Sequence, residues 1–190
     1  MTRALIVVDL QNDFCEGGSL GVTGAARTAA AVTELARTGD YDHVVATRDH
    51  HIDPGAHFSD DPDFVDSWPR HCVVGTPGAE FHADFDASVA EEVFSKGQYE
   101  AAYSGFEGTA GDGETTLADW LRERAVDEVD VVGVATDHCV RATAVDAAGE
   151  GIRTRVLLGL TAGVSRPTVD AALERLREAG VELEGEPLVG

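Results

Sequence analysis

The sequence predicts an α/β fold of three layers, in which helices cover both faces of a mostly parallel sheet of about six strands. Short runs rich in valine, isoleucine and leucine are typical of strands buried on both faces, and they cover residues 4–8, 44–46, 129–134 and 152–158. Amphipathic stretches of helical length alternate with them, over residues 25–38, 115–125, 139–148 and 167–179. This alternation indicates a parallel sheet with right-handed crossovers.

The last predicted helix has clear signals at both of its ends. Ser165 is the expected N-cap, Pro167 lies in the first turn and Gly180 follows the last turn.

With 190 residues the chain is of single-domain size, so we expect one domain over residues 1–190. The histidine-, proline- and glycine-rich residues 49–88 interrupt the alternation, and so long an irregular stretch indicates a functional loop region.

The charge balance excludes two classes of partner. The chain has 14 Lys and Arg against 35 Asp and Glu, and a net charge of -21 is the wrong sign for binding nucleic acid or an anionic membrane. Thirteen of the basic residues are arginine, so Lys96 is the only lysine. The acidity fits a high-salt cytoplasm or a bias in base composition, and the sequence does not choose between them.

The cysteines indicate a reducing compartment. Their number is odd, and the apolar run at residues 4–8 is too short to span a membrane or to act as a leader. We therefore expect a cytoplasmic protein with three free thiols, Cys15, Cys72 and Cys139.

Three residues at predicted strand ends are candidates for catalysis. Asp9 follows the strand over residues 4–8, where a partly buried carboxylate suits a general base, although such residues also cap turns. Cys139 lies where a strand turns into a helix; free amides there are expected to lower a thiol pKa, but a free cysteine is often a small core residue. Lys96 ends the run around residues 93–94. Most lone lysines lie on the surface, yet an ammonium kept among arginines favours a compact charge near a thiolate.

The loop region contains metal-ligand residue types. In an extended chain Asp49 and His51 point to the same side, while His50 points away. With His57 and His71 they form a set of one carboxylate and three imidazoles, which suits zinc, iron or manganese with coordination positions left open. The alternative is a solvated histidine-rich loop.

Together these motifs resemble the nicotinamidase (pyrazinamidase) family of the isochorismatase-like cysteine hydrolases. The resemblance rests on blocks that recur in the family's order over nearly the whole chain. They are IVVDLQNDFCEGGSL at residues 6–20, the segment 49–59 with WPRHC at 68–72, KG at 96–97 with YSGF at 103–106, and TDHCV at 136–140.

The resemblance implies an isochorismatase-like hydrolase fold and a role for each matching residue. Asp9, Lys96 and Cys139 match the family's catalytic triad. The amides of Ala135 and Cys139 match its oxyanion hole, where a cis peptide after Val134 is usual. The family's metal ligands are matched by Asp49, His51, His57 and His71, and its substrate pocket by Phe14, Leu20, Trp68, Tyr103, Val134 and His138.

The implied activity is hydrolysis of nicotinamide to nicotinate and ammonia, with pyrazinamide as a further substrate, in NAD salvage. Asp9 would take the thiol proton of Cys139, and the thiolate would attack the carboxamide carbon to give a thioester that water hydrolyses. One divalent metal ion would orient the pyridine ring. Family members differ in oligomeric state, so a homo-oligomer is compatible with the resemblance.

Two other functions are compatible with parts of the sequence. A relative acting on a carbamoyl or ureido substrate would share the Asp, Lys and Cys set, but such enzymes generally lack the histidine cluster. A metal-binding or thiol-sensing protein without catalysis would use the histidines as a metal buffer and Cys139 as a redox switch, although no second cysteine lies near Cys139 in the sequence.

Overall fold

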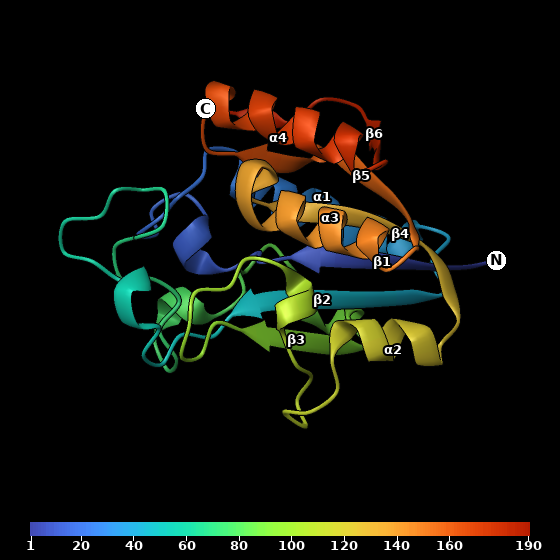
Figure 1. Cartoon of the computed structure of the whole chain (residues 1–190), viewed down its shortest axis with the longest axis horizontal. Coiled ribbons are helices and arrows are strands. Elements are labelled where there is room, and N and C mark those ends of the chain that lie inside the picture. Colours follow the sequence, from blue (N-terminus) through green and yellow to red (C-terminus); the bar gives the residue numbers. More distant parts are fainter.

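The computed structural model describes residues 1–190 and confirms the predicted α/β architecture (Figure 1). One sheet has the strand order β3-β2-β1-β4-β5-β6, a seventh strand also pairs with β5, and every pairing is parallel. The strands are β1 (Thr2–Val8), β2 (His43–Asp49), β3 (Glu92–Lys96), β4 (Val126–Val134), β5 (Arg153–Gly163), β6 (Glu182–Glu184) and β7 (Leu188–Val189). The sheet exceeds six strands because β5 continues to Gly163 and pairs there with β7.

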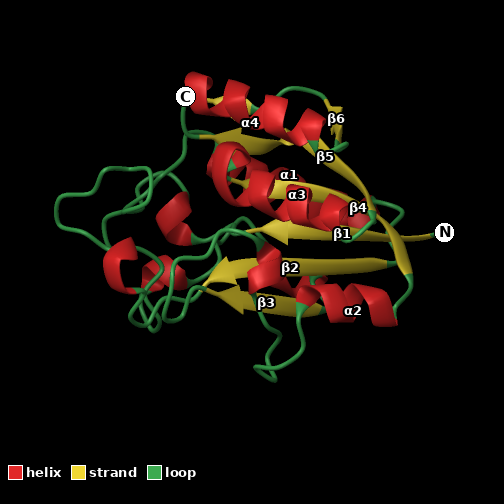
Figure 2. Cartoon of the chain, in the orientation of Figure 1, coloured by secondary structure: helices red, strands yellow, loops and turns green.

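The four helices lie close to their predicted positions (Figure 2). They are α1 (Ala25–Thr38), α2 (Leu117–Glu123), α3 (Arg141–Gly149) and α4 (Arg166–Glu178). The Ser165 side chain accepts a hydrogen bond from the Thr168 amide, which confirms the predicted N-cap. The third helix begins at Arg141 instead of residue 139 because Thr136–Val140 form a turn of π-helix between β4 and α3.

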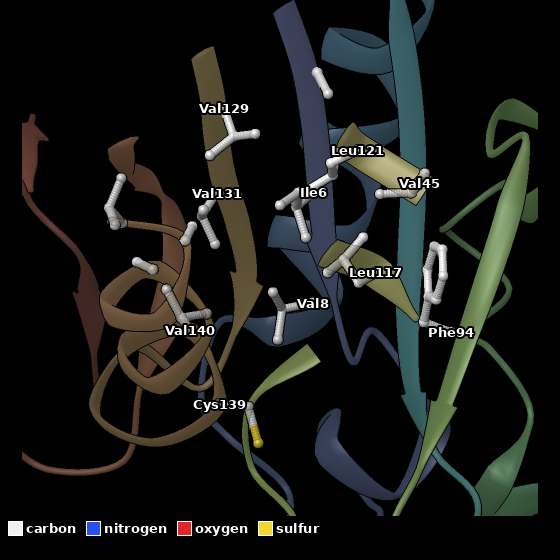
Figure 3. Packing of buried hydrophobic residues seen from close by; sticks show 14 of the residues in the cluster. Ile6, Val8, Val45, Phe94, Leu117, Leu121, Val129, Val131, Cys139 and Val140 are labelled. Atoms are coloured by element: carbon white, nitrogen blue, oxygen red, sulfur yellow. The ribbon is translucent and has the colours of Figure 1, made fainter. Parts of the chain in front are cut away.

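Helices cover both faces of the sheet because side chains alternate along each buried strand. On β1, Ile6 and Val8 pack in a cluster with α2, α3 and α4, while Leu5 and Val7 pack with α1 on the opposite face. Figure 3 shows the first cluster, with Cys139 at its edge. Burying each such aliphatic side chain contributes about 1.5–3 kcal/mol, so the two clusters hold the strand ends in fixed positions.

Most of the loop region lies beyond the carboxyl ends of β1, β2 and β3, and its last residues run back beside α1 to the start of β3 (Figure 1). It contains only short 3-10 turns, Gly55–His57, Pro77–Ala79 and Ala87–Val89, and its Trp68 and Phe85 are buried. Parallel α/β sheets bind ligands at this edge, so the fold brings the loops to the expected place for a site. The helices are all too short or too polar to cross a membrane.

Candidate active site

Adjacent strands end in the three charged candidates. Asp49 and Lys96 are the last residues of β2 and β3 and are direct partners in the register of these strands. Asp9 follows β1, the other neighbour of β2, with its φ at 48° in the left-handed region that few non-glycine residues adopt. The sheet order therefore places the side chains of all three together at one edge.

Lys96 forms the centre of this group. Its Nζ donates a hydrogen bond to Asp9 Oδ2 at 2.8 Å and a second to Asp49 Oδ1, and it lies 3.8 Å from Cys139 Sγ. Lys96 and Asp9 are completely buried, and Asp49 and Cys139 nearly so. One ammonium thus contacts two carboxylates and a thiol in a site shielded from water, where the Coulomb attraction is strong.

The pKa values of Asp9, Asp49 and Lys96 are shifted in different directions. Burial raises the pKa of the Asp9 carboxyl above its ordinary value, although Lys96 opposes this. Burial acts in the same direction on Asp49, but the Lys96 ammonium opposes it most strongly, and the pKa of Asp49 stays well below its ordinary value. Burial disfavours the Lys96 ammonium, yet Asp49 and Asp9 raise its pKa well above the usual range. Asp9 is therefore the group of the three best suited to exchange a proton.

Cys139 lies in the π-turn that follows β4. Burial raises the pKa of its thiol well above the ordinary value, Lys96 opposes this and Asp9 adds to it. The expectation that free helix amides lower this pKa is wrong, because burial outweighs the favourable charges. The thiol is protonated at neutral pH and needs a base for activation.

The backbone before Cys139 is unusual at two points. The peptide bond between Val134 and Ala135 is cis, as the family resemblance implies. Gly133 has a φ of 111°, and a Cβ on it would lie 2.2 Å from the carbonyl oxygen of Val8 on β1. Only glycine permits this close approach of β4 to β1 where the turn begins.

The predicted metal ligands form a cluster beside Lys96. One ring nitrogen from each of His51, His57 and His71 lies within 4.8 Å of the others. Asp49 Oδ2 lies 3.3 Å from His51 Nε2 and 3.6 Å from His71 Nε2. The structure thus brings together all four residues, from β2 and two separate loop segments.

The protonation of the histidines fits a bound cation. His51 Nδ1 donates to the Gly97 carbonyl at 2.5 Å and His71 Nδ1 to the Pro69 carbonyl at 2.7 Å, so Nε2 is the ring nitrogen that can bind a metal ion in each. His51 Nε2 and His57 Nδ1 are buried without a hydrogen-bond partner. Burial and the neighbouring imidazoles lower the pKa of His57 to about 4, which keeps it neutral. Lone pairs that face a carboxylate oxygen suit a divalent metal ion between them.

A cavity of about 510 Å³ opens above the group. Cys139, Ala135 and the predicted ligands Asp49, His57 and His71 line it, whereas Asp9, Lys96 and His51 are completely buried. The Trp68 indole donates a hydrogen bond to the Tyr103 hydroxyl at 3.1 Å. The lining includes all six residues predicted for the pocket, Phe14, Leu20, Trp68, Tyr103, Val134 and His138.

Several residues of the site have no role in the sequence prediction. Thr47 Oγ1 donates to Asp9 Oδ1 at 2.7 Å, and the Gln11 side chain bonds both the amide and the carbonyl of Asp49, each at 2.8 Å. The period of two along a strand puts Thr47 on the same side as Asp49 and could have found it. The outer wall of the cavity is completed by residues far from the others in the sequence, and nothing in the sequence predicts their place in the pocket. These residues are Phe64, Val164, Ser165 and Thr168.

Comparison with known proteins places the chain in a family. Residues 3–185 match the model of the isochorismatase domain. The chain is 64% identical over 182 residues to the nicotinamidase/pyrazinamidase of Mycobacterium tuberculosis, covering 95% of this chain and 97% of the relative.

Solved structures agree with this assignment. PnC1 from L. infantum, in complex with nicotinate, superposes with a TM-score of 0.84 at 34% identity, covering 96% of this chain and 91% of that one. The pyrazinamidase of Pyrococcus horikoshii, in complex with zinc, gives a TM-score of 0.81 at 37% identity, covering 96% and 98%. The chain therefore belongs to the isochorismatase family and, within it, to the nicotinamidase/pyrazinamidase group of amide hydrolases.

Proposed function

We propose that this enzyme hydrolyses nicotinamide to nicotinate and ammonia, with pyrazinamide as a further substrate. The observation that carries the proposal is the position of Lys96, whose ammonium contacts a base candidate, a metal-ligand candidate and a thiol at the floor of one cavity. The names of the similar enzyme from M. tuberculosis and of the nicotinate complex support the substrate class. Nicotinate is a precursor for nucleotide synthesis, so the reaction belongs to NAD salvage in the cytoplasm.

The first half of the reaction transfers the acyl group to Cys139. Asp9 accepts the thiol proton, and the sulfur forms a bond to the carboxamide carbon while the electron pair of the C=O bond moves to oxygen. The amides of Ala135 and Cys139 stabilise this oxyanion. When the C=O bond re-forms, the C–N bond breaks, Asp9 returns its proton to the nitrogen, and ammonia and a thioester result.

The second half releases the acid. Asp9, again a carboxylate, accepts a proton from water while the water oxygen forms a bond to the thioester carbon. As the C=O bond re-forms, the C–S bond breaks and the proton held by Asp9 passes to sulfur. The acid leaves and loses its remaining proton, which came from the attacking water, to the solvent, which gives nicotinate. Burial raises the pKa of Asp9, which suits a group that must accept and return a proton twice in each turnover.

Lys96 and Thr47 hold the base in place for these transfers. Each donates to a different oxygen of Asp9, so the carboxylate cannot rotate away from the thiol. The fixed positive charge of Lys96 also stabilises the thiolate as it forms, because its Nζ lies 3.8 Å from the sulfur.

Substrate orientation is assigned to the cavity walls and the histidine cluster. Phe14 and Trp68 present flat apolar surfaces that suit a pyridine ring. A divalent metal ion held by Asp49, His51, His57 and His71 would supply a Lewis-acid site for the ring nitrogen. The ligand set suits zinc, iron or manganese alike.

Ammonia release by the purified, metal-loaded protein tests the proposal. We expect ammonia and nicotinate in equal amounts from nicotinamide, turnover of pyrazinamide, and no turnover of an N-carbamoyl amino acid. Removing the metal with a chelator should abolish turnover, and zinc should restore it. Turnover of the carbamoyl compound without turnover of nicotinamide would contradict the substrate assignment, and full activity in metal-free protein would contradict the role of the metal.

A further inference from the structure

The carboxylate of Asp137 accepts hydrogen bonds from a segment that lies far from it in the sequence. The residue is 1% exposed and lies in the π-turn two positions before Cys139. Its Oδ1 accepts a hydrogen bond from the Val164 amide at 3.0 Å, and its Oδ2 accepts from Thr168 Oγ1 at 2.5 Å and from the Ser165 amide at 3.4 Å. These donors belong to the junction between β5 and α4.

The bond from Thr168 is charge-assisted. Thr168 Oγ1 has one proton and lies close to Asp137 Oδ2, to Ser165 Oγ at 2.6 Å and to the Ser165 carbonyl at 3.1 Å. The carboxylate is the strongest acceptor of the three, so the proton goes to Asp137 and Ser165 Oγ donates to Thr168 Oγ1. A buried charge is thereby compensated by two amides and a hydroxyl.

A second bond joins the same two segments. Thr136, next to Asp137, donates through its buried Oγ1 to Thr161 Oγ1 on β5 at 2.8 Å. Gly163 also packs closely here, since a Cβ on it would lie 3.4 Å from the Thr136 Cβ of the π-turn and 2.3 Å from a methyl of Val169 on α4. The π-turn is therefore bound to the end of β5 and to the start of α4 at successive residues.

The two joined segments both line the same cavity. His138 and Cys139 of the π-turn line its inner part, and Val164, Ser165 and Thr168 line its outer part. A shift between the segments would move the thiol relative to the part of the cavity wall that Val164, Ser165 and Thr168 form. Displacements of about 1 Å between reacting groups can lower rates by about 100-fold.

We propose that Asp137 is a positioning residue that fixes the π-turn carrying Cys139 against the outer wall of the pocket. It acts through hydrogen bonds and does not touch the substrate. The proposal rests on the proposed amidase function for its kinetic test, but the position of the Cys139 thiol can be measured without any substrate.

Substitutions at position 137 test the proposal. Asp137→Ala removes every bond, and we expect kcat to fall and KM to rise, with kcat/KM for nicotinamide down about 100-fold. Asp137→Asn should recover most of the loss, because its oxygen can accept from Val164 while its NH2 donates to a Thr168 hydroxyl that turns to the Ser165 carbonyl. Asp170→Asn, an exposed acid on the same helix α4, is the matched control and should leave both parameters unchanged.

A second pair of variants covers the case in which Asp137→Ala does not fold. Thr168→Val removes the hydroxyl from the outside of the junction, and we expect kcat/KM to fall about tenfold, whereas Thr168→Ser keeps the donor and should lose much less. A loss in Thr168→Ser as large as that in Thr168→Val would overturn the proposal.

Alkylation separates this proposal from the proposed function. Iodoacetamide modification of Cys139, followed by peptide mass spectrometry, should be several times faster in Asp137→Ala than in the wild type, because the turn is released. If wild-type protein does not hydrolyse nicotinamide, the proposed function fails while this comparison still tests Asp137. Folded Asp137→Ala with the wild-type rate of alkylation would overturn the positioning role.

Discussion

The single lysine of the chain is also the residue on which the site depends most. Lys96 replaces water as the partner of two buried carboxylates and lies beside the thiol. An arginine would bring a larger planar group with fixed donor directions into a space that holds a compact ammonium. The burial of Lys96 in this space explains why position 96 is a lysine while the other thirteen basic residues are arginines.

Replacing Lys96 by methionine should destabilise the protein strongly. The change leaves Asp9 buried without its cation and takes the Lys96 ammonium from Asp49, and breaking a buried ion pair from one side costs about 3–5 kcal/mol. Urea unfolding at equal metal loading measures the free energy. Arg166→Met is the control, since the Arg166 side chain is exposed, its pair with Asp170 spans 3.9 Å, and such pairs contribute about 0–1 kcal/mol. Equal stability of the two variants would contradict this account of Lys96.

At the residue scale, the sequence predicts which side chains come together in the site but not the hydrogen bonds and burial that fix them there. Asp9 and Lys96 are found because each lies at the end of a predicted strand, and Asp49 is found because it lies beside histidines in the loop region. Gln11 is missed because its hydrogen bonds to Asp49 depend on the exact approach of loop and strand, and Thr47 is missed because the strand predicted from residue 44 ends before it. The raised pKa of Cys139 is missed for a related reason: burial depends on every element packed around the thiol.

At the scale of elements, a buried carboxylate joins three strands away from the site. Asp130 on β4 accepts two hydrogen bonds from Arg155 on β5, both at 2.8 Å, and one from the Tyr41 hydroxyl at 2.6 Å. Arg3 on β1 lies 3.1 Å away. Burial raises the pKa of Asp130, but the bonds from Arg155 and Tyr41 outweigh it, so the pKa is lower than the ordinary 3.8.

This network predicts a pH-dependent contribution to stability. Because the folded pKa of Asp130 is lowered, its contribution is present above about pH 4 and is lost as pH falls below that value. Asp130→Asn should lower the free energy of unfolding at pH 7 by about 3 kcal/mol. In urea unfolding, the difference in unfolding free energy between the wild type and Asp130→Asn should decrease as the pH falls below 4. Asp170→Asn is the control. A gap that stays constant with pH would refute this linkage.

Element positions are predicted best where packing and local signals agree. The bounds of α1 match the prediction, and α4 has the expected cap, because periodicity, Ser165 and Gly180 agree. The start of α3 is missed, since a π-turn has no simple residue pattern and forms here where β4 meets the helix beside β5. The short strands β6 and β7 are missed because two or three residues carry no periodicity.

At the scale of the whole molecule, sheet order explains why distant residues form one site. The order β3-β2-β1-β4 places the ends of four strands side by side, and they supply Lys96, Asp49, Asp9 and the turn with Cys139. The loops over this edge supply the histidines and the aromatic walls. The net charge of -21 has no part in the proposed chemistry, whose buried core depends instead on a single cation.

The central claim is that Cys139 is the nucleophile of an amide hydrolysis. Ammonia release from nicotinamide should be compared in wild type, Cys139→Ala and Cys15→Ala, all metal-loaded. Cys15 is a buried thiol that does not line the cavity, so its variant controls for the loss of a core sulfur. We predict turnover in the wild type and in Cys15→Ala, and none above background in Cys139→Ala. Persistent turnover in folded Cys139→Ala would contradict the covalent mechanism.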